Sequence, residues 1–494
     1  MPRPPLLLLL AALTLGAAHA APPTPSDPRA MMQAFVRAYW DPERGYFYTY
    51  SDRKTHPEHG IGPVGGLYSD FWWEAQLFDL VMDAYEATGD AAYKTMIGDV
   101  WDGFTSEYPA FPNDYNDDLG WWAQGAIRAY NLTGERRYLD TSGELADRIW
   151  EDWDDRYGGG LWWRRSVRDQ KNVATNAPYV NTSVRLYQAT GDAKYLDRAK
   201  EAYAWVKARL VDGPRVYDHV SGEGNGTVTT WDFTYNFGNF VLAALALRDA
   251  TGDDAYLTDA KTAMDWALRN LTQNGVLLDE GANDGGGFKG VTVRALKRLS
   301  KEPGGEVYLA ALRDQGASTW NARRADGLVG TAWDAVPFND PIQSLTAGSA
   351  VAAVLNAGAQ PARIPWRDGR YEAENAQKLG VDAASRAPGY SGRGYINNFR
   401  SFGQGVAFDV NAPRAGTYRV TLRYGAGGGN ASRQLVLNGA GRLVNFASTP
   451  DWNTWGTVKT TVALPQGPSR LTVLFGPEGY GWLNLDSLTL EATP

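Results

Sequence analysis

The sequence predicts a multidomain protein in which an all-α region of stacked helical hairpins is followed by an all-β sandwich. From about residue 29 to 358, apolar residues recur at three- and four-residue spacing, which is the period of amphipathic helices. From 370 onward the apolar residues alternate with polar ones, as in "TYRVTLRYG" at 417–425, which is the period of a β-strand with one buried face.

A repeated turn divides the helical region. It occurs as "ATGDAAYK" at 87, "LTGERRYLD" at 132, "ATGDAKYLDRA" at 189 and "ATGDDAYLTDA" at 250. Each copy places a glycine where a helix ends in a left-handed turn, followed by an acid that caps the next helix. Hairpins repeated at intervals of about 45 to 60 residues cannot bury their faces alone, so they stack as an open solenoid or a closed ring.

The ends and the junction of these regions have compositions of their own. Residues 1–20 contain basic Arg3, a leucine-rich run and an Ala-His-Ala cleavage pattern, which together predict a secretory signal peptide. A connector rich in Pro, Gly and Ala at 359–369 separates the helical domain, 29–358, from the β domain, 370–494. We therefore expect a protein that is secreted or periplasmic.

The composition excludes several classes of function. Cysteine is absent, which removes disulfides, thiolate catalysis and Cys-ligated zinc. A net charge of −8 without basic runs is not that of a nucleic-acid-binding protein. The apolar run near the N-terminus is shorter than the roughly 20 residues that span a bilayer, so we expect no membrane partner. The 19 Trp and 26 Tyr suit surfaces that meet amphipathic ligands such as sugars.

Two consecutive acids, Asp117 and Asp118, precede a pair of tryptophans in "YNDDLGWWAQ". One interpretation is a helix cap, for which Asn and Asp are ordinary residues. The other is a catalytic pair, because carboxyls on adjacent residues can lie about 5 Å apart, the separation of a retaining glycosidase. Their mutual repulsion raises the proton affinity of one acid while the other stays ionised.

The helical region resembles glycoside hydrolase family 76, the endo-α-1,6-mannanases. The motifs that carry the resemblance are "NDDLGWWA", "GGLWW", "KNVATN" and "TYNFGN". The resemblance implies an (α/α)6 toroid whose central cleft hydrolyses α-1,6-linked mannose chains internally, with retention and without a catalytic cofactor. It also implies that Asp117 is the nucleophile and Asp118 the acid/base.

Other residues of the cleft follow from the same motifs and from "VYDHV" at 216–220, whose Asp218 resembles an acid of the family. The candidates for sugar binding are Trp121, Trp122, Asn176, Asp218, Tyr235 and Asn236. Each has a structural alternative: core packing for the tryptophans, helix capping for the amides, and a solvated loop for the aspartate.

Three acids of the β domain form a candidate calcium site. Glu372 and Glu374 are two residues apart and share one face of a strand, and Asp486 lies on the last strand. Three hard oxygen donors could hold calcium. The alternative is a solvated edge strand carrying unrelated acids.

The β domain resembles a family 35 carbohydrate-binding module, close to family 6. "YEAENA", "GYSGRGYINNF", "DWNTW" and "WLNLDSLTL" occur in the order of the family. The resemblance implies a jelly roll with structural calcium near the three acids, and it matches Tyr395, Trp452 and Asn484 to sugar-binding positions.

Together these observations predict a secreted, monomeric retaining endo-glycosidase that hydrolyses α-1,6-mannosidic linkages and is targeted to mannan by its module. A mannan-processing transglycosidase is an alternative, because the same covalent intermediate allows transfer to a sugar. A non-catalytic glycan-binding protein is the alternative from another class.

Overall fold

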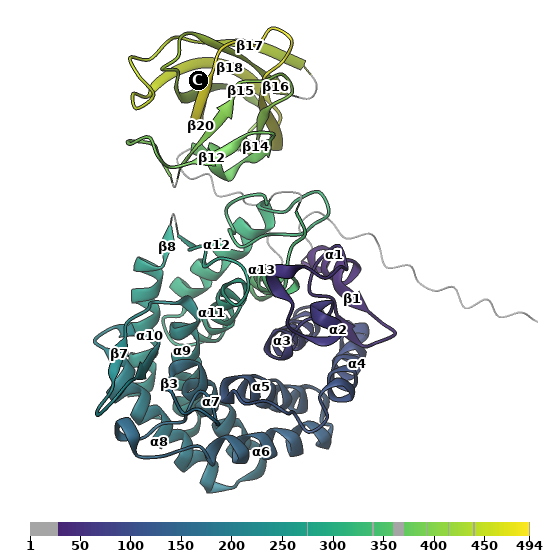
Figure 1. Cartoon of the computed structure of the whole chain (residues 1–494), viewed down its shortest axis with the longest axis vertical. Coiled ribbons are helices and arrows are strands. Elements are labelled where there is room, and N and C mark those ends of the chain that lie inside the picture. The colour runs from purple at the N-terminus through teal and green to yellow at the C-terminus, as the bar shows by residue number, and fades with distance from the viewer. Residues whose placement is uncertain are drawn as a thin grey trace, which may run out of the picture.

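The computed structural model has a helical domain followed by a β domain (Figure 1). It describes residues 28–493 except 274, 338–339, 359–369, 393, 413 and 438–439. The signal peptide expected at 1–20 and the linker expected at 359–369 lie outside the described residues. No helix in the described part of the chain is long and apolar enough to cross a membrane.

The helical domain contains long helices joined in pairs. They are α1 (Arg29–Tyr39), α3 (Phe71–Thr88), α4 (Ala91–Glu107), α5 (Asn116–Thr133), α6 (Arg136–Trp150), α7 (Val173–Thr190), α8 (Ala193–Leu210), α9 (Thr234–Thr251), α10 (Asp254–Asn270), α11 (Gly285–Leu299), α12 (Glu306–Asn321) and α13 (Ser344–Ala357), besides the short α2 (Pro63–Gly66).

The odd-numbered helices from α3 to α13, called here the ring helices, form a closed ring. Each contacts the next one along the chain, and α13 contacts α3. Helices α4, α6, α8, α10 and α12 lie outside them, and α1 packs on α13, as Figure 1 shows. Because each of the first five ring helices is followed by an outer helix that runs back, the ring helices all begin on the same face.

The repeated turn explains the hairpins. Gly89, Gly134, Gly191 and Gly252 end α3, α5, α7 and α9 in the left-handed conformation, with φ between 67° and 78°. The expected acidic cap follows in three of the four turns, where an Asp side chain accepts a backbone N–H of the next helix. Glu135 makes no such bond, because its longer side chain is a poorer cap than Asp.

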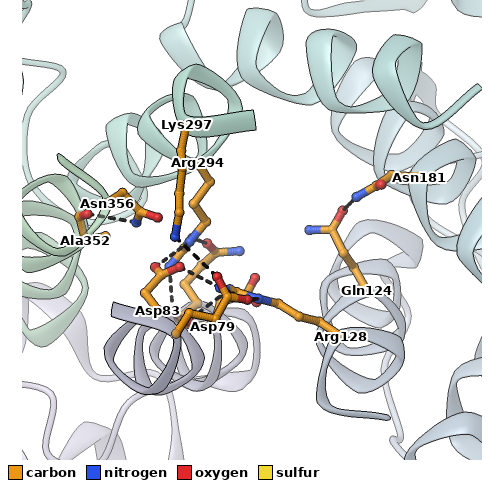
Figure 2. Close-up of polar contacts among 11 residues, drawn as sticks. Asp79, Asp83, Gln124, Arg128, Asn181, Arg294, Lys297, Ala352 and Asn356 are labelled. Atoms are coloured by element: carbon orange, nitrogen blue, oxygen red, sulfur yellow. Dashed lines mark hydrogen bonds and ion pairs between the residues drawn. The ribbon is translucent and has the colours of Figure 1, made fainter. Parts of the chain in front are cut away.

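Paired charges line the ring interior toward the C-terminal ends of its helices (Figure 2). This charge cluster consists of Asp79, Asp83, Glu86, Arg128, Arg294 and Lys297. Arg128 on α5 donates to Asp79 at 2.9 Å and to Asp83 at 2.7 Å, and Arg294 on α11 donates to the second Asp83 oxygen at 2.8 Å. The cluster thus ties α3 to both α5 and α11 from inside the ring.

The face on which the ring helices begin carries loops and short strands. The strands are β1 (Trp40–Asp41), β2 (Tyr46–Phe47), β3 (Gln170–Asn172), β4 (Val211–Asp212), β5 (Arg215–Val216), β6 (His219–Ser221), β7 (Thr227–Thr229), β8 (Thr272–Gln273) and β9 (Val276–Leu277). Strands β3, β6 and β7 form one small sheet, and they place the 159–172 loop beside the start of α5.

The β domain is built from two sheets of antiparallel strands. One sheet contains β12 (Asp382–Ala384), β13 (Tyr395–Phe399), β20 (Leu483–Ala492), β15 (Gly416–Gly425) and β18 (Gly456–Leu464) in that order, with β10 (Arg370–Glu372) also paired to β20. The other contains β11 (Gln377–Leu379), β14 (Gly405–Ala412), β19 (Gly467–Leu474), β16 (Ala431–Leu437) and β17 (Ala440–Phe446). Their apolar faces enclose a separate hydrophobic core.

Candidate active site

A cavity of about 1140 Å³ lies at the face where the ring helices begin. Its walls come from the first turns of α3, α5, α9 and α11 and from the loops that precede them. Helix N-termini carry partial positive charge, which favours anions within the first turn. The ring therefore concentrates this favourable field on one cavity.

Asp117 and Asp118 occupy the first turn of α5 and line the cavity. Neither is the N-cap of the helix, which is Tyr115 and makes no side-chain capping bond. The Trp163 indole N–H donates to Asp117 Oδ2 at 2.9 Å, and the Asn113 amide donates to Asp118 Oδ2 at 2.8 Å. Each acid thus has a donor of its own from a different loop, which is more than a helix cap requires.

Both carboxyls hold protons more tightly than usual. Burial raises the pKa of Asp117 to about 7, although the Trp163 hydrogen bond opposes the shift. Burial also raises the pKa of Asp118 well above its ordinary value, and the neighbouring Asp117 charge raises it further. The pair therefore combines one acid that ionises near neutrality with one that stays protonated, which is the division of roles expected of a nucleophile and a general acid.

Two further acids, Asp70 and Asp284, line the same cavity. Asp70 accepts the Trp73 N–H as the N-cap of α3 and contacts His59 Nε2 at 2.9 Å. Asp284 accepts the indole N–H groups of Trp72 at 3.0 Å and Trp73 at 3.1 Å. Burial raises the pKa of Asp70, although His59 opposes the shift. The site therefore gathers carboxylates from three ring helices or their preceding residues.

The opposite wall contains the predicted residues Asp218 and Tyr235. Asp218 contacts His219 Nδ1 at 2.7 Å and accepts the Tyr235 hydroxyl at 3.4 Å. The Tyr235 ring stacks on Phe288 with centroids 4.0 Å apart. This wall pairs hydrogen-bonding groups with flat aromatic faces, a combination that suits a sugar ring.

Three predicted sugar-binding residues lie elsewhere. Trp122 is 0% exposed and packs on Phe104 in the core, because successive helix residues point about 100° apart and its neighbour Trp121 takes the cavity side. Asn176 is 0% exposed, and its amide bonds the backbone of residues 161 and 172. Asn236 is also 0% exposed and donates to the Trp231 carbonyl. None of the three lines the cavity.

Trp121 does line the cavity, with its ring 6.2 Å from that of Trp72. Sequence reasoning missed Trp72, Asp70, His59, Asp284 and Asn113 as site residues. One signal was present: an acid shortly before a Trp-Trp pair occurs both in "SDFWWEAQ" at 69–76 and in "DDLGWWAQ" at 117–124. The two stretches begin neighbouring ring helices.

The predicted sugar-binding residues of the module fall into two groups. Trp452 and Asn484 both lie beside Gly425 on β15. Tyr395 is 5% exposed, its hydroxyl accepts a backbone N–H, and its ring contacts Trp455 edge-on at 5.2 Å. Tyr395 therefore supports Trp455 and offers little surface of its own to a ligand.

The three acids predicted to bind calcium lie near Ser391 and Gly392. The Ser391 hydroxyl contacts Glu372 at 2.6 Å and Asp486 at 2.8 Å, and Glu374 lies beside Gly392. Arg423 donates to Asp486 at 2.5 Å. Among the described residues, no group of three Asp, Glu, His or Cys side chains could hold a metal ion as they stand.

The fold and site define a class of protein. Residues 26–303 match glycosyl hydrolase family 76, and residues 369–493 match carbohydrate binding module family 35. The first match spans more than half of the chain. The chain therefore belongs to glycosyl hydrolase family 76 and is a glycoside hydrolase with a C-terminal carbohydrate-binding module.

Solved structures of similar chains include the alpha-1,6-mannanase of Salegentibacter sp. HEL1_6. It is 27% identical and superposes with a TM-score of 0.62 over 67% of this chain and 97% of its own. The same enzyme in complex with alpha-1,6-mannotriose is an inactive variant with two consecutive aspartates changed to asparagine, and it matches at 26% identity, a TM-score of 0.62 and the same shares of the two chains.

Curated relatives are similar over shorter stretches. The mannan endo-1,6-alpha-mannosidase DCW1 of Saccharomyces cerevisiae is 30% identical over 227 residues, 40% of this chain and 50% of the relative. The isomaltosyltransferase of Sporosarcina globispora is 34% identical over 122 residues, 24% of this chain and 11% of the relative. This chain thus spans half of the mannosidase and about a tenth of the transferase.

Proposed function

We propose that this protein is a retaining endo-glycosidase that hydrolyses α-1,6-mannosidic linkages in mannan. The observation that carries the proposal is the Asp117-Asp118 pair, which lies in the cavity of a closed helical ring with a separate hydrogen-bond donor on each acid. The consecutive aspartates replaced in the inactive Salegentibacter mannanase support it.

In the proposed mechanism, Asp117 attacks the anomeric carbon while Asp118 protonates the departing sugar oxygen. Trp163 stabilises the ionised form of Asp117, and the proton held by Asp118 is available to the leaving group. After the glycosyl–Asp117 ester forms, Asp118 has lost its proton and activates the water that hydrolyses the ester. Two displacements retain the configuration at the anomeric carbon.

The surrounding residues have supporting roles in this proposal. Asp70, Asp218 and Asp284 accept hydrogen bonds from sugar hydroxyls, and Tyr235 contacts a sugar ring. Trp121 lines the cavity but is only 3% exposed, so it contributes an edge of the wall and no stacking face. The closed contact cycle of the ring helices supports an (α/α)6 toroid, and the two antiparallel sheets support a jelly roll.

The module is proposed to hold the enzyme on its polysaccharide through Trp452 and Asn484. Attachment raises the local substrate concentration without a new contact in the cavity. Calcium would be held by Glu372 and Glu374, with Asp486 joining them if it releases Arg423. A lower Tm in EDTA, restored by added calcium, is the expected result.

Secretion, which rests on the N-terminal sequence, and a monomeric state complete the proposal. Transfer to a sugar acceptor is an alternative outcome of the same covalent intermediate. Added mannose oligosaccharides would then appear in longer products during the reaction.

Proton NMR of a digest of linear α-1,6-mannan tests the proposed reaction. Oligosaccharides whose reducing ends are first α-anomers would establish retaining, internal cleavage. We expect Asp117→Asn and Asp118→Asn each to lower kcat by about 10³-fold or more, because each removes a group that takes part in the bond exchange.

The exposed Asp140→Asn on α6 is the matched control and should retain wild-type activity. Thermal unfolding of each variant verifies that the fold is intact. If Asp117→Asn and Asp118→Asn both turned over substrate at the wild-type rate, the two acids would have a purely structural role.

A further inference from the structure

A second cavity, of about 900 Å³, lies between the helical domain and the module. Its helical wall comes from residues near 50–58, 279–283 and 330–346, and its module wall from residues 374–394. Glu58 and Asn283 line both this cavity and the one that contains Asp117. The two cavities therefore adjoin at these residues, and the second is called here the interdomain groove.

The junction between the cavities is rigidly held. Gln343, immediately before α13, accepts the backbone N–H of Asn283 at 2.7 Å. Its amide donates to Asn283 Oδ1 at 2.8 Å and to the Tyr50 hydroxyl at 2.9 Å. Asn283 has a positive φ of 55°, and the next residue, Asp284, is fixed in the catalytic cavity by two indoles. Asn283, which lines both cavities, is thus followed directly by Asp284 in the cavity that contains Asp117.

The walls of the interdomain groove have the chemistry of a sugar site. The helical wall offers Thr331 and Asp340 as hydrogen-bonding groups beside the small apolar Ala335. The rings of Tyr50 and His56 lie together with centroids 4.3 Å apart. Apolar patches interrupted by a few polar groups match the alternating faces and hydroxyls of a pyranose.

The module wall, like the helical wall, combines apolar and polar residues. It carries fewer positive charges than a site that binds a polyanion. It presents Ala383, Ala384 and Ser385 toward the groove, and the Lys378 ammonium donates to the Glu374 carbonyl at 2.6 Å. A neutral polyhydroxyl chain fits this wall better than a phosphorylated or sulfated one, because the described residues that line it include no cluster of cations.

We propose that the interdomain groove binds the same α-1,6-mannan chain beyond the catalytic cavity, so that the module forms one wall of the substrate path. This inference rests on the proposed function. A long chain then contacts both domains at once, whereas a short oligosaccharide fills the catalytic cavity alone. The extra contacts favour long chains and fix the distance along the chain between the groove and the cleavage point.

Two groove-filling variants and one control test the inference in the full-length protein. Ser385→Trp fills the groove from the exposed module wall, and Ala335→Trp fills it from the helical wall. Ser401→Trp places the same side chain at an exposed serine of the module that does not line the groove. The measurements are kcat/KM for long linear α-1,6-mannan and for α-1,6-mannotetraose, and the initial product lengths from mannan.

The expected result is that both groove variants lower the mannan-to-tetraose ratio of kcat/KM by about tenfold and alter the initial product lengths. Ser401→Trp should keep the wild-type ratio. Groove variants with a ratio within twofold of wild type and unchanged product lengths would overturn the inference. A wild-type protein that cleaves neither substrate is a different result, and it would overturn the proposed function together with the groove.

Discussion

Buried carboxyl groups at the two ends of the ring interior have different partners and opposite pKa shifts. At the C-terminal ends, Asp83 accepts hydrogen bonds from Arg128 at 2.7 Å and Arg294 at 2.8 Å. Burial raises the pKa of Asp83, but these cations lower it further than burial raises it. At the N-terminal ends, Asp117 and Asp118 receive only neutral N–H donors, and burial raises the pKa of both.

The difference teaches that burial alone does not decide whether these acids are charged. Carboxylates on the same set of helices stay ionised to low pH where a guanidinium is present and hold their protons to higher pH where it is missing. The ion pairs at the C-terminal end connect the helices. The Asp117 and Asp118 carboxyl groups at the N-terminal end, which have no cationic partner among the described residues, keep protons that can be transferred in a reaction. Three changes test this contrast, beginning with the largest expected effect.

Arg128→Met should lower the free energy of unfolding by about 3–5 kcal/mol, because it leaves Asp79 and Asp83 buried without their common partner. Chemical denaturation measures the loss. Methionine keeps an apolar chain in place of the arginine stem, so the decrease in the free energy of unfolding measures the removal of the guanidinium charge. Turnover of mannotetraose well below the melting transition should remain near wild type. A loss below about 1 kcal/mol would show that the cluster is solvated and contributes little.

Asp117→Asn should stabilise the protein near neutral pH. The folded pKa of Asp117, about 7, lies above its unfolded value, so wild-type stability is fully present below about pH 4 and decreases as the pH rises toward 7. The stability difference between variant and wild type should therefore grow over this range, by at most about 1.4 kcal/mol per pH unit. Denaturation at several pH values measures it.

The exposed Asp140→Asn provides the reference for that series and should show a difference that is independent of pH. A constant difference for Asp117→Asn as well would mean that Asp117 is ionised throughout, and the contrast between the two ends would fail.

Trp163→Phe gives the smallest effect and acts on Asp117, the proposed nucleophile, alone. It removes the indole N–H from Asp117 and keeps an aromatic ring beside Tyr115. Because this donor favours the ionised carboxylate, its loss should move the acidic limb of the kcat/KM profile to higher pH by up to about one unit. The alkaline limb, assigned to Asp118, should stay in place. Equal movement of both limbs would contradict separate roles for the two acids.

Local patterns in the sequence predicted the hairpins and the position of the acidic pair. The left-handed glycines and most of the aspartate caps depend on neighbouring residues only, so "TGD" was sufficient to place them. The pair was predictable because adjacency in sequence already fixes adjacency in space.

Residues whose roles depend on distant partners were beyond sequence reasoning. Asp284 accepts its hydrogen bonds in the site from Trp72 and Trp73, which lie more than 200 residues earlier. Asn176 has a side chain typical of sugar-binding residues, but its amide forms hydrogen bonds with the backbone of residue 161. The partners of Asp284 are invisible in a linear pattern because ring closure brings the start of α3 near that of α11, whereas the path of the 161 loop sets the partners of Asn176.

Ring closure has a consequence for how this domain could be rebuilt. The contact of α1 with α13 brings the natural ends of the helical domain together, while the glycine turns lie on the face opposite the cavity. A circular permutant that joins those ends and opens at Gly134 or Gly191 would preserve every helix pair and leave the catalytic face without a chain end.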